Sequence, residues 1–258
     1  MPIPAADTII TAMTMGMMMG TRMAMTTLII TIMLADTNLH RLLAWTSPSY
    51  PVGSFTYSHG LETAVEDGRV RTAADVAAYV EAVLARGGGW VDAVLFVHAY
   101  RAADDAAAFD TIAELAAAFR GSSETALESR QQGGSFLSVT RKAWPHPMLD
   151  AFAQRWGDYP MAHVAVMALA CAAHGIALEP ALHAWLHATA ANLVSAGVRL
   201  VPLGQTDGQL ALAALSHAIP AIADKATVTA LDDLGTAAPD LELASLAHET
   251  LYTRLFRS

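Results

Sequence analysis

The chain has 258 residues, a formal net charge of −9 and a sequence pI near 5.5. Phosphate binding needs a basic surface, and the sequence has no block rich in lysine and arginine, so nucleic acid is a disfavoured partner. Apolar residues make up 54% and aromatic residues only 7%; much of the apolar share is alanine, which predicts closely packed helices rather than sheets.

The first 37 residues hold most of the chain's 12 methionines. A targeting peptide places its basic residues before the apolar stretch, but here the lone basic residue, Arg22, lies inside it. That arginine and the many threonines also argue against a membrane span. We expect residues 1–37 to form a disordered leader or one translated upstream of a natural start at Met33. A thioether site for a soft metal is the alternative interpretation.

From residue 38 to 258 the chain predicts one compact all-α bundle of roughly ten helices, because apolar residues recur at helical spacing without strand-like alternation. Thr72 is the expected cap of a helix that three glycines, 87–89, end. Gly133 and Gly134 are expected inside a helix, and Pro160 in the first turn of an apolar central helix. The other helices are expected over 37–47, 57–68, 90–103, 104–122, 179–200, 210–226 and 239–256.

His183 and His187 are the best candidates for metal ligands in the sequence, but the signal for a metal site is weak. Their i, i+4 spacing places both imidazoles on one helix face, as in many divalent-ion sites. No acidic residue lies beside them, which favours two ordinary helix-surface or packing histidines over a metal site. The only cysteine, Cys171, lies in an apolar run and is expected to be a small buried residue rather than a nucleophile. A helical metal-binding enzyme using His183 and His187 is the alternative function.

Four segments carry more polar and turn-forming residues than packing requires. Two glycines inside a helix cost roughly 1 kcal/mol each relative to alanine, which favours a close helix approach or a break. Asp207 is placed to cap the next helix. The arginine- and aromatic-rich end of the chain has the composition of interface anchors, although a helix packed back on its own domain is the alternative. The segments are SPSYPVGSFTYSHGLE (47–62), LESRQQGGSFL (127–137), VRLVPLGQTDGQ (198–209) and HETLYTRLFRS (248–258).

In this order, and from about residue 38 to the end, these segments resemble the signature stretches of the urease accessory protein family UreF. One departure is His59, where members of the family commonly carry glutamine. The methionine-rich leader is a second departure.

The resemblance implies an all-α, dimeric, cytoplasmic protein that is not an enzyme and holds no cofactor. UreF proteins bind UreD (UreH in some organisms) and recruit the GTPase UreG. The complex docks on apo-urease for nickel insertion. Members are proposed to modulate the UreG GTPase and to line a path for nickel.

Partner-binding residues follow from the same resemblance. The tail is expected to order against UreD, where Arg254 and Arg257 donate hydrogen bonds and three apolar side chains supply buried area. A second group belongs with this docking region or supports it, and a third is a candidate for a surface that faces UreG or organises the dimer. The tail group is Tyr252, Arg254, Leu255, Phe256 and Arg257. The second group, with the docking region, is Pro48, Ser54, Tyr57, Gly60 and Glu62. The third group, for the surface that faces UreG or organises the dimer, is Arg130, Gln131, Gly204, Gln205 and Asp207.

Overall fold

The computed structural model describes residues 37–257, so the predicted leader lies outside the described residues except for Thr37. The chain divides into two units, Met1–Leu43 and Ala44–Ser258. In the first unit the described residues, 37–43, are helical, and the Arg41 guanidinium donates a hydrogen bond to Asn38 Oδ1 at 2.9 Å.

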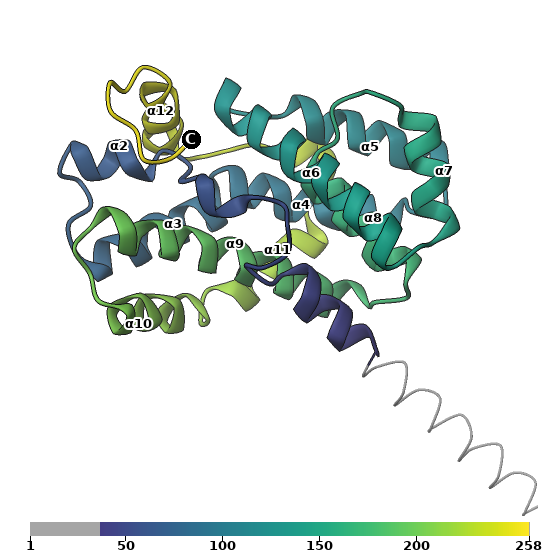
Figure 1. Ribbon diagram of the computed structural model, residues 1–258, viewed down its shortest axis with the longest axis horizontal. Coiled ribbons are helices and arrows are strands. Elements are labelled where there is room, and N and C mark those ends of the chain that lie inside the picture. The colour runs from purple at the N-terminus through teal and green to yellow at the C-terminus, as the bar shows by residue number, and fades with distance from the viewer. Residues whose placement is uncertain (1–36, 258) are drawn as a thin grey trace, which may run out of the picture. The chain divides into compact units, whose positions relative to one another are not determined.

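The second unit is all-α throughout its described part, which confirms the predicted fold class (Figure 1). Eleven α-helices are found there, against the roughly ten expected. They are α2 (Leu61–Glu66), α3 (Ala73–Arg86), α4 (Gly88–Arg101), α5 (Ala106–Ala118), α6 (Ser123–Ala143), α7 (Pro147–Trp156), α8 (His163–Ala173), α9 (Leu178–Leu200), α10 (Gln205–Leu215), α11 (Ile219–Val228) and α12 (Pro239–His248), with 3-10 turns η1 (Ser54–Thr56) and η2 (Leu231–Asp233).

Helix α8 is the centre of the bundle, as its apolar sequence predicted. Every residue from Val164 to Cys171 is buried, and the helix packs between α4 and α6. Helix α9 forms a second centre, packed on α3, α4, α10 and α11. No helix within residues 37–257 combines the length and apolar character needed to cross a bilayer.

Gly133, in the middle of α6, lies where another part of the backbone comes very close to the helix. A Cβ atom at this position would lie 2.0 Å from the Met161 carbonyl oxygen, in the segment that leads into α8. Only glycine allows the two backbones to approach so closely. Gly134 differs, because a Cβ atom there would meet open space. The predicted close approach is therefore confirmed for the first of the two glycines.

Several predicted helix boundaries were wrong. The single helix expected over 210–226 is two helices, α10 and α11. Gly87 ends α3, but Gly88 and Gly89 lie inside α4, because the chain re-enters a helix at once. Pro160 precedes α8, which begins three residues later. The last helix stops at His248 instead of continuing to residue 256. The residues beyond it turn back onto the bundle. By contrast, Thr72 caps α3 as expected, in a capping box with Asp75.

The C-terminal helix α12 lies on α2, apart from the central helices (Figure 1). The contact is close because Gly60, with φ +76°, has no Cβ; one placed there would lie 2.7 Å from the Ser245 backbone nitrogen. The buried face of α12 is small and polar, formed by Ala244, Ser245 and His248. Polar contacts rather than apolar burial therefore hold this helix.

Candidate functional site

The site is the surface that holds the tail, defined here as residues 249–257. It is assembled from the loop before α2 and the first turn of that helix, the first turn and the middle of α6, the end of α9 and the tail itself. All of these except the first turn of α6 are parts of the four polar segments singled out in the sequence. The structure thus brings together stretches that are far apart along the chain.

A buried histidine bridges two carboxylates at the base of the tail. His248 is fully buried, with Nδ1 at 2.7 Å from Glu124 Oε2 and Nε2 at 3.0 Å from Glu62 Oε2. The other Glu124 oxygen accepts a hydrogen bond from Arg254 at 2.5 Å. Buried ionisable groups are stable only when they are paired in this way, so the cluster specifies one position for the end of α12.

Glu62 also forms hydrogen bonds with the backbone of the tail. Its carboxylate accepts the N–H of Leu255 at 2.7 Å and the N–H of Phe256 at 3.0 Å. Because the contacts use main-chain atoms, the Leu255 side chain stays 65% exposed. The Tyr252 side chain is also fully exposed. The backbone of the tail is therefore held by Glu62, and the Tyr252 and Leu255 side chains point outward.

Phe256 is the apolar anchor of the tail. Only 3% of it is exposed, and the Arg199 guanidinium lies 4.4 Å from the ring centroid. Arg199 also donates to the Phe55 carbonyl oxygen at 2.8 Å. Partial burial lowers the pKa of Arg199. Phe256 thus packs on its own chain in this structure, which is the alternative that the sequence left open for the end of the chain.

Gln131 links the tail to the loop before α2. Its side-chain oxygen accepts the Tyr57 hydroxyl at 2.7 Å and lies 3.5 Å from the Arg257 guanidinium. The Arg257 N–H donates to the Thr56 carbonyl at 2.7 Å. Burial, and next the Glu128 charge, raise the pKa of Tyr57, so its hydroxyl stays protonated as a donor. Three of the predicted partner-binding residues, Tyr57, Gln131 and Arg257, therefore lie together.

Other predicted residues lie elsewhere in the unit. Gly204 and Gln205 are exposed at the start of α10. Gly204 is the N-cap of this helix, and Asp207, expected to be the cap, lies in the first turn, where its Oδ2 accepts the Gly204 N–H at 2.9 Å. Arg130 is exposed on α6. Pro48 and Ser54 line a cavity described below.

Sequence reasoning missed Glu124, and assigned no role to His248. Glu124 lies in the first turn of α6, two residues after the Ser122 cap, where an acidic residue is ordinarily explained by the helix dipole. Its i, i+4 spacing to Glu128 was the one available signal, and the two carboxylates are both buried. Burial of the pair is decided by α2 and the tail, not by local sequence.

The metal hypothesis finds no support among residues 37–257. No group of three or more histidine, cysteine, aspartate or glutamate side chains is placed there to hold an ion. His183 is half-buried and His187 is exposed. Cys171 is buried, and burial raises the pKa of its thiol, as expected of a packing residue. The proposed methionine site lies outside the described residues.

The polar segments of this helical unit converge on its own tail. Comparison with known proteins identifies the family to which the chain belongs. The profile of the UreF family matches residues 70–216. The urease accessory protein UreF of Granulibacter bethesdensis is 52% identical over 225 residues, 86% of this chain and 95% of the relative. UreF of Bradyrhizobium sp. strain ORS 278 is 49% identical over 224 residues, 85% and 92% of the two chains.

The UreF protein of Rhodopseudomonas palustris strain TIE-1 is 47% identical over 222 residues, 85% of this chain and 92% of the relative. The chain belongs to the UreF family of urease accessory proteins, which confirms the resemblance seen in the sequence. It is an accessory protein and not an enzyme, so the metalloenzyme alternative built on His183 and His187 was wrong.

Proposed function

We propose that this protein acts in urease maturation as a scaffold that binds UreD (UreH) and recruits the GTPase UreG to apo-urease for nickel insertion. Membership of the UreF family supports the general role in urease maturation. The named partners, a homodimeric state, a cytoplasmic location and modulation of the UreG GTPase belong to the proposal. So does the division of the chain into a leader, 1–37, and an all-α domain, 38–258.

The observation that carries the proposal is the outward presentation of the tail. Main-chain contacts to Glu62 fix its position, while Tyr252 and Leu255 remain exposed beside two arginines. Aromatic, leucine and arginine side chains on a rigid backbone are suited to bind a partner, because little conformational entropy is lost on association. The exposed Leu243 and Leu246 of α12 extend the apolar surface. We assign this face to UreD.

The test is size-exclusion chromatography with light scattering on the protein mixed with UreD and UreG, with and without residues 251–258. We expect a defined complex with the full chain and none with the truncated one. Tyr252→Ala and Leu255→Ala should each weaken UreD binding by about 30-fold, the effect of losing a 2 kcal/mol anchor. Tyr159→Ala, at a tyrosine that is also exposed, is the matched control. Undiminished binding by the truncated chain would refute the assignment of the tail.

The UreG-facing surface is a separate part of the proposal, with Arg130 as its best probe. Arg130 is exposed on α6, whereas Arg199 holds Phe55 and Phe256 and its removal would disturb the tail as well. Single-turnover GTP hydrolysis by UreG should change with Arg130→Ala and not with Arg71→Ala, at another exposed arginine. Equal hydrolysis with both variants would exclude a direct action of Arg130 on the nucleotide.

A further inference from the structure

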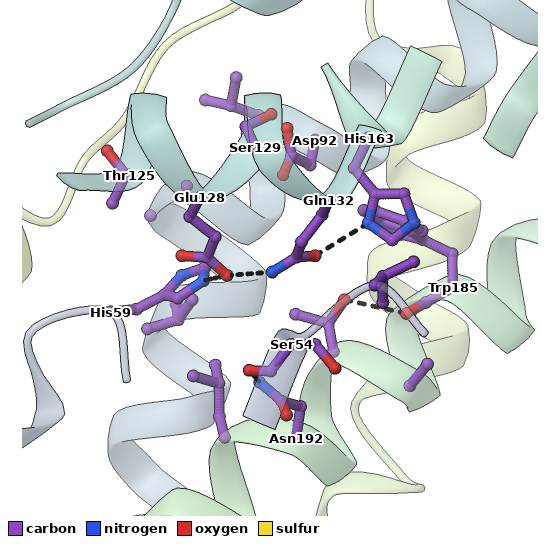
Figure 2. Close-up of a pocket in the computed structure, with 18 of the residues that line it drawn as sticks. Ser54, His59, Asp92, Thr125, Glu128, Ser129, Gln132, His163, Trp185 and Asn192 are labelled. Carbon is purple, nitrogen blue, oxygen red and sulfur yellow. Dashed lines mark hydrogen bonds and ion pairs between the residues drawn. The ribbon is translucent and has the colours of Figure 1, made fainter. Parts of the chain in front are cut away.

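A cavity of about 580 Å³ lies inside the second unit, beside the tail site. Figure 2 shows Glu128 and Gln132 of α6 on one side of this space, and Ser54 and Asn192 on the other. Ser54 belongs to η1, in the loop before α2. This loop supplies several residues of the lining, namely Pro48, Val52, Ser54, Phe55 and His59. The wall opposite α6 is therefore formed by a loop and not only by helices.

The α6 side is held in place by a connected set of side chains (Figure 2). Glu128 Oε1 accepts the Gln132 amide at 2.8 Å and lies 3.1 Å from His59 Nε2. Burial disfavours the imidazolium of His59, but the charge and the hydrogen bond of Glu128 outweigh it and raise its pKa. The Gln132 oxygen faces Nδ1 of a second lining histidine, His163, at 3.0 Å, and burial lowers the pKa of that histidine to about 3. These contacts tie α6 to α8 and to the end of the loop, so this side of the cavity is fixed.

The other side is held differently, through the main chain of η1. Its three carbonyl oxygens, in chain order, accept hydrogen bonds from Asn192 Nδ2 at 2.9 Å, the Arg199 guanidinium at 2.8 Å and the Arg257 N–H at 2.7 Å. No residue of η1 is buried, and Phe55 is 59% exposed. A segment with little apolar burial opens locally at a low free-energy cost. These three hydrogen bonds therefore decide whether η1 stays in place.

Two of the three hydrogen bonds depend on the tail. The Arg257 N–H is part of the tail itself, and the Arg199 guanidinium lies against the Phe256 ring, 4.4 Å from its centroid. A guanidinium over an aromatic ring is attracted to it, more strongly where water is excluded, and Phe256 is buried. Undocking of the tail would thus break the first contact and leave Arg199 without its support. Only the hydrogen bond from Asn192 would be unaffected.

We propose that residues 53–56 are a gate of the cavity, which the docked tail holds closed. The gate begins at Gly53, whose φ of +78° and open surroundings allow it to act as a hinge. It ends at Tyr57, which is buried and fixed by its hydroxyl contact to Gln131. Release of the tail lets η1 turn away from α9, which opens a path from solvent into the cavity. A molecule that binds or displaces the tail thereby controls access. The gate operates in the isolated protein, so it stands apart from the partners proposed for the tail.

A thiol placed on the cavity wall measures whether the gate opens. Met167 lines the cavity and is 1% exposed, so Met167→Cys supplies this thiol in the full-length protein. Cys171, one turn further along α8, is buried outside the lining and reports opening of the helix itself. Labelling by iodoacetamide, followed at each thiol by mass spectrometry, gives both rates. Adding Phe256→Ala should speed labelling of the introduced thiol about tenfold, the effect of losing one hydrogen bond and one cation–π contact, and leave Cys171 unchanged.

Amide exchange of Thr56 and Tyr57 measures the gate directly, because their N–H groups donate to carbonyl oxygens three residues earlier while η1 is formed. Both should exchange faster in Phe256→Ala, whereas Leu210→Ala, at an exposed leucine of α10, should change neither measurement. Unchanged exchange would overturn the proposal by showing that the tail does not hold η1. Faster exchange with unchanged thiol labelling would overturn it by showing that η1 is not the entrance.

Faster labelling of Cys171 as well would also overturn the proposal, because it would show that α8 opens and not a gate. Both measurements use the protein without UreD or UreG. A failure of the gate is therefore distinguishable from a failure of the tail to bind UreD.

Discussion

Replacing Glu62 with glutamine tests the reasoning on the tail directly. The side chain is 8% exposed, and its two oxygens accept from the Leu255 N–H, the Phe256 N–H and His248 Nε2. A carboxamide has one accepting oxygen and one donating NH₂ group, so in either orientation at least one of these donors faces another donor. The shape of the side chain is unchanged. The variant therefore isolates the loss of the carboxylate as an acceptor.

The expected effect is a local release of the tail. A hydrogen bond to a charged group contributes about 1.5–3 kcal/mol, so loss of one should shift the docking equilibrium by about 2 kcal/mol, or roughly 30-fold. The amide hydrogens of Leu255 and Phe256 should exchange with solvent faster by that factor, and trypsin should cleave after Arg254 more readily. Exchange in α8 should not change, because local openings are independent of the global one.

Glu66→Gln is the matched control, since Glu66 lies one helical turn further along and is exposed. It should leave exchange in the tail unaltered. Protection of Leu255 and Phe256 that is the same in Glu62→Gln and in the native protein would refute the anchoring role of this carboxylate. Uniformly faster exchange over the whole unit would instead show that Glu62 stabilises the fold, not the tail alone.

Two further predictions concern stability. Gly133→Ala should lower the free energy of unfolding by about 1–3 kcal/mol or more, because its Cβ would meet the Met161 carbonyl, whereas Gly134→Ala should raise it by up to about 1 kcal/mol; urea unfolding of both compares the sites. The two cavity histidines should act oppositely with pH. The lowered pKa of His163 contributes stability that is complete above its ordinary pKa of 6.5 and lost as pH falls toward 3, so His163→Phe should flatten the acid limb of the stability profile. The raised pKa of His59 contributes stability that is complete below 6.5 and lost as pH rises through the folded value, so His59→Gln should flatten that higher range instead; equal profiles for both variants and the native protein would contradict this account.

The sequence by itself determined the all-α class, the apolar central helix and several local features. Alanine content and helical spacing are properties of neighbouring residues, and so are the Thr72 cap and the Asp207 contact to the start of α10. The glycine of α6 also signalled a close approach before its partner was known. The helix pattern and the caps follow from interactions within about four residues, which local sequence encodes. The glycine signalled only that some backbone comes close, and not which one.

Only the tertiary structure decided how the tail site is assembled. His248 meets Glu124 across 124 positions of the chain and Glu62 across 186. The tertiary structure also decided where the last helix ends. The helical pattern of apolar residues continues beyond His248, but the Leu255 and Phe256 N–H groups donate to Glu62 instead of to helix carbonyls. Local rules cannot tell a buried carboxylate from a solvated one, because burial depends on which distant segments pack above it. The sequence identified the four segments, and the packing of α2, α6, α9 and α12 made them one site.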